Sequence, residues 1–184
     1  MSKKVLVIMA EGFEEIEAIT IIDVLRRAGL DVIVAGVSGK TIAGAHGIQV
    51  QADIELGKYH ETPDAVVLPG GMPGSQNLAE SEEVAMILKK VHSQKKVVGA
   101  ICAAPALALG KHGILEGKKA TCYPGFEKHF PASAKFTNQR VVVDGNVVTG
   151  SGPGSALEFA LELVAQLGDS KKAAELKEGM LVKA

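Results

Sequence analysis

The stretch VVGAICAAP, residues 97–105, indicates the fold more directly than any other part of the chain. Its first five residues carry no polar side chain, which is typical of a strand buried on both faces of a parallel sheet. The strand runs directly into Cys102, where small residues such as Gly99 and Ala103 leave room for a sharp turn. A short helix is predicted from Ala103 to Leu109. This strand, turn and helix are the repeating unit of an α/β fold.

Similar units follow one another along the rest of the chain. Uninterrupted apolar runs predict strands, and segments with helical periodicity lie between several of them. The predicted strands are residues 5–9, 32–35, 65–68, 120–123, 141–143 and 147–149. The predicted helices are residues 15–28 with Gly29 as C-cap, a helix opened by Ser81-Glu82-Glu83, residues 155–167 with a Ser155…Glu158 capping box, and a polar last helix. Residues 40–53 look extended and irregular, with a turn at Gly47.

Strands separated by helices imply an α/β fold in which helices cover both faces of a mostly parallel sheet. No linker, repeat or low-complexity tract interrupts residues 1–184, so we expect a single domain.

The composition excludes several classes of protein. The chain has 184 residues, 47% of them hydrophobic and 22% charged, with a net charge of -1. That balance leaves no basic surface for nucleic acid or an anionic membrane, so we expect small molecules or another protein as partners. The apolar run 5–10 is too short to span a membrane, and no signal-peptide cleavage site accompanies it. Two cysteines suit a reducing compartment, and we expect a soluble cytoplasmic protein.

Three segments follow directly after predicted strands: residues 11–14, 69–71 and 102–104. In open parallel sheets the ligand site lies beyond the carboxyl ends of the strands. The three segments therefore predict the place of the functional site.

Cys102 is the first candidate for chemistry. Its position at a strand-to-helix turn is typical of a nucleophile elbow, and the N-terminus of the following helix should lower the pKa of the thiol. The alternative is a buried structural cysteine, a common fate for this residue type.

Glu17 is the second candidate. On a helical projection it lies in line with the apolar stripe of Ile21, Leu25 and Ala28, which should face the sheet. A carboxyl on that stripe must be protonated or hydrogen-bonded, so its pKa should be raised. The alternative is a solvated acid in the first turn. Glu14 projects near the same stripe, and periodicity does not choose between the two.

Other residues carry weaker signals. Gly70 and Gly71 offer backbone N–H groups for an oxyanion, although an ordinary turn explains them equally well. We expect Cys122, on the predicted strand 120–123, to be an inert half-buried thiol. Tyr123 has the opposite orientation and is a candidate to point into the site.

Neither a nucleotide nor a metal site is expected. Residues 150–155 resemble the dinucleotide-binding motif G-x-G-x-x-G, but Ser155 stands in the place of its last glycine. Residues 39–41 resemble the end of the P-loop motif G-x-x-x-x-G-K-[ST], but Val34 stands in the place of its first glycine. The five histidines, of which His46 is one, form no H-x-x-x-H pair and no cluster with the cysteines.

Taken together, these segments resemble the ThiJ/PfpI superfamily, and within it the group of the parkinsonism-associated deglycase DJ-one. Five motifs carry the resemblance in the family's order over nearly the whole chain. They are residues 5–17, 23–29, 66–71, 100–105 and 152–155.

The resemblance implies a flavodoxin-like three-layer sandwich, a homodimer and a reactive elbow cysteine at Cys102, without a cofactor. It implies that Glu17 is the protonated partner of that thiol. Gly71 and Ala103 would supply backbone N–H groups near it. The residues that would complete the lining of the site are Gly70, Tyr123 and Ser155.

Three positions depart from relatives. The animal members carry a histidine in place of Tyr123, so a Cys–His pair is absent and any general base is Glu17 or water. The protease-like PfpI branch has a histidine in place of Ala103, so a cysteine protease lacks its base. The animal proteins also carry an arginine near the dimer seam in place of His46.

The resulting hypothesis is a cofactor-free enzyme acting on 2-oxoaldehydes. It would be a glyoxalase III-like lyase that converts methylglyoxal to lactate, or a deglycase that hydrolyses glyoxal-modified proteins or nucleotides. The rival is an oxidative-stress sensor or chaperone that works through oxidation of Cys102, and a PfpI-type hydrolase is a third alternative. Ile16, Ile19 and Thr20 lie opposite the core stripe of the first helix, which favours a homodimer.

Overall fold

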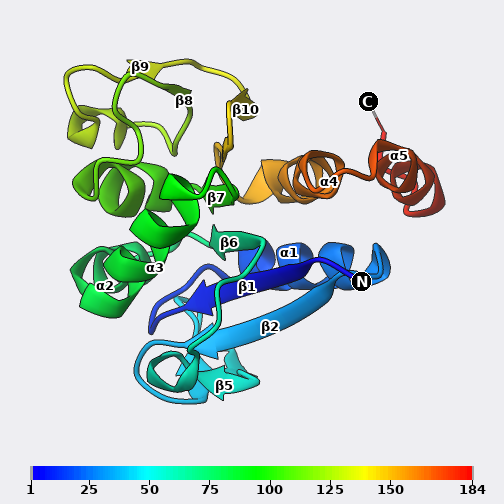
Figure 1. Cartoon of the computed structure of the whole chain (residues 1–184), viewed down its shortest axis with the longest axis horizontal. Coiled ribbons are helices and arrows are strands. Elements are labelled where there is room, and N and C mark those ends of the chain that lie inside the picture. Colours follow the sequence, from blue (N-terminus) through cyan, green and yellow to red (C-terminus); the bar gives the residue numbers. More distant parts are fainter. Residues whose placement is uncertain (1, 184) are drawn as a thin grey trace.

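The central sheet has seven strands in the order β10-β11-β7-β6-β1-β2-β5 (Figure 1). The computed structural model describes residues 2–183. The strands of the sheet are β1 (Lys4–Met9), β2 (Asp31–Gly36), β5 (Ile54–Glu55), β6 (Ala65–Leu68), β7 (Val97–Ile101), β10 (Val141–Asp144) and β11 (Val147–Gly150). Every neighbouring pair is parallel except the β10–β11 hairpin. The predicted mostly parallel sheet is confirmed.

Helices cover both faces of this sheet, because the side chains of a strand alternate between its faces. The helices are α1 (Glu15–Arg27), α2 (Gly74–Glu80), α3 (Glu82–Ser93), α4 (Ala156–Gln166) and α5 (Ser170–Gly179). On β1, Val5 and Val7 join the core beneath α1 and α4, whereas Leu6 and Ile8 join the core beneath α2 and α3. The three layers of the α/β sandwich follow from this alternation.

Two helix boundaries are as the sequence predicts. Gly29 follows α1 with φ of 77°, a left-handed conformation that glycine adopts without strain. The Ser81 side chain accepts a hydrogen bond from the Val84 N–H and so caps α3.

Residues 40–53 are more regular than the sequence suggests. β3 (Thr41–Ala43) pairs antiparallel with β4 (Gln49–Gln51), and Gly47 turns between them with φ of 83°. Helix α2 was not predicted, because it begins at a glycine after Pro73 and has no side-chain N-cap. β5 was missed as well, since two residues are too few to show a period.

The predicted strand 120–123 is wrong beyond its first residue. β8 covers Lys119–Ala120 and pairs with β9 (Lys135–Phe136) in a separate small sheet. The next residues leave the ladder for other partners, because Thr121 N–H donates to Thr149 Oγ1 and Tyr123 N–H donates to the Cys102 carbonyl.

The predicted Ser155…Glu158 capping box is also wrong. The Ser155 hydroxyl donates to the Gly152 carbonyl at 2.9 Å and so folds the loop before α4 onto itself. Glu158 instead accepts from Arg140 Nε at 2.7 Å. The short helix after Cys102 is present but begins at Ala104, and its Pro105–Leu109 portion is π-helical. Within residues 2–183, no helix has the length and apolarity needed to cross a membrane.

Candidate active site

Cys102 stands in a strained turn at the carboxyl end of β7. Its φ is 65°, a left-handed conformation that costs a residue with a side chain about 1–2 kcal/mol. Two backbone hydrogen bonds hold it there: Cys102 N–H donates to the Gly150 carbonyl at 2.9 Å, and its own carbonyl accepts from Tyr123 N–H at 2.8 Å. The strain and the fixed backbone identify the predicted elbow.

Gly70 lets the thiol and Glu17 approach each other. A Cβ at Gly70 would lie 2.5 Å from the Cys102 Cβ and 2.7 Å from Glu17 Oε2. Neither contact is compatible with a side chain larger than hydrogen. The turn after β6 therefore requires a glycine at the point where it passes between the two groups.

Glu17 is fully buried on the sheet-facing side of α1, as the apolar stripe predicts. Its Oε2 accepts a hydrogen bond from Gly70 N–H at 2.7 Å. Its Oε1 has no hydrogen-bond partner of good geometry among residues 2–183. Burial, aided by the charge of Glu14 and opposed by the Gly70 N–H, raises the pKa of Glu17 to about 7.

The expected lowering of the thiol pKa is wrong. Burial, together with the negative charge of Glu17, raises the pKa of Cys102 to about 12, against the opposing N–H groups of Gly71 and Ala103. Folding surrounds the thiol with buried groups and places a carboxylate beside it, and these outweigh the effect of the helix N-terminus that follows. A proton on Glu17 removes that negative charge, so the two groups titrate as a pair.

The N–H groups of Gly71 and Ala103 favour the ionised form of the Cys102 thiol. Their role at an oxyanion stays a prediction. Gly71 has φ of 93°, and a Cβ there would lie 2.4 Å from the Glu14 nitrogen and 2.6 Å from the Gly12 carbonyl oxygen. Glycine at this position allows two loops to meet beside the thiol.

Tyr123 and Ser155 line a cavity of about 270 Å³ that adjoins the elbow but does not include Cys102. The Tyr123 ring packs over Gly152, where a Cβ would lie 3.2 Å from its Cδ2. Ser155 is buried, and its hydroxyl is satisfied within its own loop.

Cys122 borders the same cavity but is fully buried, not half-buried as expected. Burial raises the pKa of its thiol to about 12. Both cysteines are free thiols.

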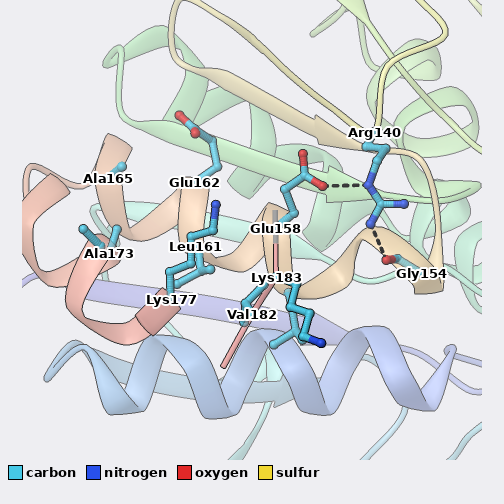
Figure 2. Close-up of a pocket in the computed structure, with 12 residues that line it drawn as sticks. Arg140, Gly154, Glu158, Leu161, Glu162, Ala165, Ala173, Lys177, Val182 and Lys183 are labelled. Carbon is cyan, nitrogen blue, oxygen red and sulfur yellow. Dashed lines mark hydrogen bonds and ion pairs between the residues drawn. The ribbon is translucent and has the colours of Figure 1, made fainter. Parts of the chain in front are cut away.

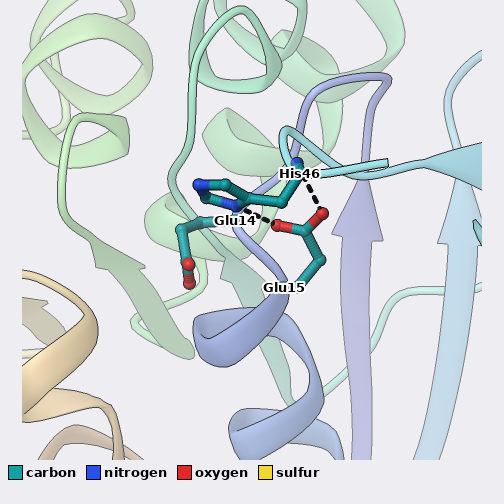
Figure 3. Close-up of side chains that lie close together, drawn as sticks. All are labelled: Glu14, Glu15 and His46. Carbon is teal, nitrogen blue, oxygen red and sulfur yellow. Dashed lines mark hydrogen bonds and ion pairs between the residues drawn. The ribbon is translucent and has the colours of Figure 1, made fainter. Parts of the chain in front are cut away.

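Sequence reasoning missed a second contact of the first helix, the one between Glu15 and His46 (Figure 3). Glu15 Oε1 accepts from the His46 N–H at 2.6 Å, and Glu15 Oε2 lies 2.7 Å from His46 Nδ1. Glu14, Glu15 and His46 thus offer atoms of metal-ligating type within 4.8 Å of one another. Both oxygens of Glu15 already accept hydrogen bonds, so the cluster fastens the β3–β4 turn to α1.

A wide cavity lies away from the elbow, between α4, α5 and the last described residues (Figure 2). It measures about 740 Å³ and is bordered by the Arg140–Glu158 ion pair. It contains no cysteine and none of the residues that the sequence singles out for chemistry.

Known proteins resemble this chain in sequence and in fold. The profile of the DJ-1/PfpI family matches residues 3–166. "Protein DJ-1 homolog B" of Arabidopsis thaliana is 42% identical over 184 residues, which are 99% of this chain but only 42% of that relative. "Glutathione-independent glyoxalase DJR-1.2" of Caenorhabditis elegans is 38% identical over 164 residues, covering 88% of this chain and 87% of that protein. The solved structure "Toxoplasma gondii DJ-1, oxidized" matches with a TM-score of 0.96 and 41% identity, covering 100% of both chains.

Proposed function

The chain belongs to the DJ-1/PfpI family, and from that membership we propose that it is a cofactor-independent cysteine enzyme acting on 2-oxoaldehydes. The specific reaction is the conversion of methylglyoxal to lactate, or the hydrolytic removal of glyoxal-derived groups from modified proteins or nucleotides. A C. elegans relative that carries the name of a glutathione-independent glyoxalase supports this reaction class.

One observation carries the proposal: a buried carboxyl with one unpartnered oxygen lies beside a thiol in a strained turn. A protonated Glu17 carboxyl that donates a hydrogen bond to the Cys102 sulfur would stabilise the thiolate form of Cys102. Nucleophilic attack needs that thiolate, and proton transfer needs a carboxyl whose pKa lies near the operating pH. Burial brings the pKa of Glu17 to about 7.

In the proposed first step, Cys102 Sγ forms a bond to the aldehyde carbon of methylglyoxal. The carbonyl electron pair moves to oxygen, and the N–H groups of Gly71 and Ala103 stabilise the oxyanion. Glu17 gives its proton to that oxygen, which yields a hemithioacetal and leaves a carboxylate.

In the second step the Glu17 carboxylate removes the proton from the former aldehyde carbon, which gives an enediol, and returns it to the neighbouring carbon, while the hydroxyl proton of the hemithioacetal passes to the oxygen of that neighbouring carbon. The product is a thioester of lactate on Cys102. Water then attacks the thioester carbon, the C–S bond breaks, and lactate and the thiol are released. The animal relatives carry a histidine at the position of Tyr123, and a tyrosine does not replace it as a base. Glu17 is therefore the base in this scheme.

The direct test is lactate formation from methylglyoxal in metal-free buffer without glutathione. We expect turnover by wild type and by Cys122→Ser, and none by Cys102→Ser. Lactate produced at the same rate by Cys102→Ser would refute the cysteine mechanism.

An oxidative-stress sensor is the second candidate, because a protonated Glu17 could hydrogen-bond to an oxidised Cys102. A related solved structure is described as oxidised, which fits the chemistry of such a thiol. A sensor would show negligible turnover when reduced and a change in stability or partner binding when oxidised. A PfpI-type hydrolase is disfavoured by Ala103, which leaves the thiol without a neighbouring base.

We also propose a homodimer in a reducing compartment such as the cytoplasm. Ile16, Ile19 and Ile48 are 58%, 45% and 57% exposed, an apolar content that suits burial against a second copy. Both thiols are free, which suits a reducing environment.

A further inference from the structure

Three hydrogen bonds form a closed ring between the start of α1 and the turn after β6. Glu14 N–H donates to the Gly70 carbonyl at 2.9 Å, and Gly70 N–H donates to Glu17 Oε2 at 2.7 Å. Glu17 N–H completes the ring by donating to Glu14 Oε2 at 2.8 Å. Each residue donates and accepts, so the position of the Glu17 carboxyl depends on the other two.

Glu14 is an unusual residue for its place in this ring. It is the N-cap of α1 and is 8% exposed. Serine, threonine, aspartate and asparagine are the preferred N-caps, and glutamate is not among them. A capping requirement alone therefore does not explain a nearly buried carboxylate here.

The negative charge of the Glu14 carboxylate offers a reason for its presence at this N-cap. The negative charge of Glu14 favours the protonated form of Glu17. Glu17 and Cys102 compete for one proton, and the form with the proton on Glu17 is the one in which Cys102 is a thiolate. A negative charge beside Glu17 shifts the pair toward the reactive form.

We propose that Glu14 is a positioning residue of the Cys102 site, whose carboxylate holds Glu17 in place by accepting from the Glu17 N–H and favours the thiolate through its charge. The inference rests on the proposed function only in taking Cys102 as the nucleophile. It assigns Glu14 no contact with substrate.

Few other charged groups face Glu17. Cys102 faces it from the elbow, and the turn after β6 contributes only the Gly70 N–H. Glu15 is turned to the β3–β4 turn, where it accepts from His46 (Figure 3). A protonated His46 would partly offset the charge of Glu14, so the pH profile is compared between variants that all retain His46.

The test measures the alkylation rate of Cys102 by iodoacetamide from pH 5 to pH 9, with Cys122→Ser in every protein. Glu14→Gln keeps an acceptor oxygen but removes the charge. Its rate at pH 7 should fall by about two- to fivefold, because a Glu17 pKa lower by half to one unit leaves less of the carboxyl protonated, and the inflection of the profile should move to lower pH. Glu14→Asp keeps the charge and is a preferred N-cap, so its rate should stay within about twofold of the parent.

Thermal unfolding of the same proteins separates positioning from general damage. A Glu14→Gln profile that superposes on the parent profile would overturn the proposal. Equal slowing of both variants, in proportion to their loss of stability, would overturn it too. Alkylation requires no substrate, so a parent protein without glyoxalase turnover would refute the proposed enzyme and leave this comparison valid.

Discussion

Cys102 and Cys122 differ in their neighbours more than in their burial. Burial raises the pKa of both thiols to about 12. Cys102 has two N–H groups and a carboxyl that can take its proton, whereas the charge that acts on Cys122 is that of Glu127, which opposes ionisation. Reactivity should therefore belong to Cys102.

Limiting iodoacetamide at neutral pH should label Cys102 and leave Cys122 nearly untouched. Cys102→Ser should abolish labelling, and Cys122→Ser should preserve it. Peptide mass spectrometry identifies the modified residue. Equal labelling of the two thiols in wild type would contradict the assignment.

The buried carboxyl of Glu17 should make stability depend on pH. Its pKa is raised from 4.5 to about 7, so its stabilising contribution is complete below pH 4.5 and is lost as pH rises through 7. We expect wild type to lose up to about 3 kcal/mol of unfolding free energy relative to Glu17→Gln over this window. Urea unfolding of both proteins at several pH values measures the difference. A constant difference from pH 4.5 to pH 8 would show that Glu17 titrates normally.

At this scale the sequence identifies the residues but not their electrostatics. The elbow position of Cys102 and the apolar stripe of Glu17 are visible in the sequence. Periodicity cannot separate Glu14 from Glu17, because the deciding contact is with Gly70, more than fifty residues away. The thiol pKa was mispredicted for the same reason.

At the scale of elements, the turn after β6 fits between α1 and the elbow only without a side chain at Gly70. Gly70→Ala should force Cys102 and Glu17 apart, slow alkylation of Cys102 and destabilise the protein by about 1–3 kcal/mol. Gly179→Ala is the matched control, since nothing lies within 4 Å of a Cβ there. Alkylation kinetics and thermal unfolding test both variants, and unchanged reactivity in Gly70→Ala would contradict the close approach.

The long elements were predictable because their patterns are local. β1, β7 and α1 each show a clear apolar run or stripe, and Ser81 and Gly29 mark helix ends. Residues 120–123 were misassigned because their hydrogen bonds go to Thr149 and Cys102, partners that no local pattern reveals.

At the scale of the whole molecule, the exposed face of α1 predicts association. Ile16 and Ile19 project from this face, and Ile48 lies on the turn that Glu15 fastens to it. Light scattering at micromolar concentration should give twice the mass of the chain. Ile16→Glu together with Ile19→Glu should give a monomer, and Met86→Glu, at an exposed apolar residue of α3, should not. A wild-type monomer would refute the proposed homodimer.

The central claim is that turnover passes through the sulfur of Cys102. Graded peroxide treatment should convert increasing fractions of Cys102 to sulfinate, which has no thiolate to attack a carbonyl. Mass spectrometry of Cys102 and lactate formation are measured on the same samples. The account predicts that activity falls in direct proportion to the reduced fraction of Cys102, and turnover that survives complete oxidation would contradict it.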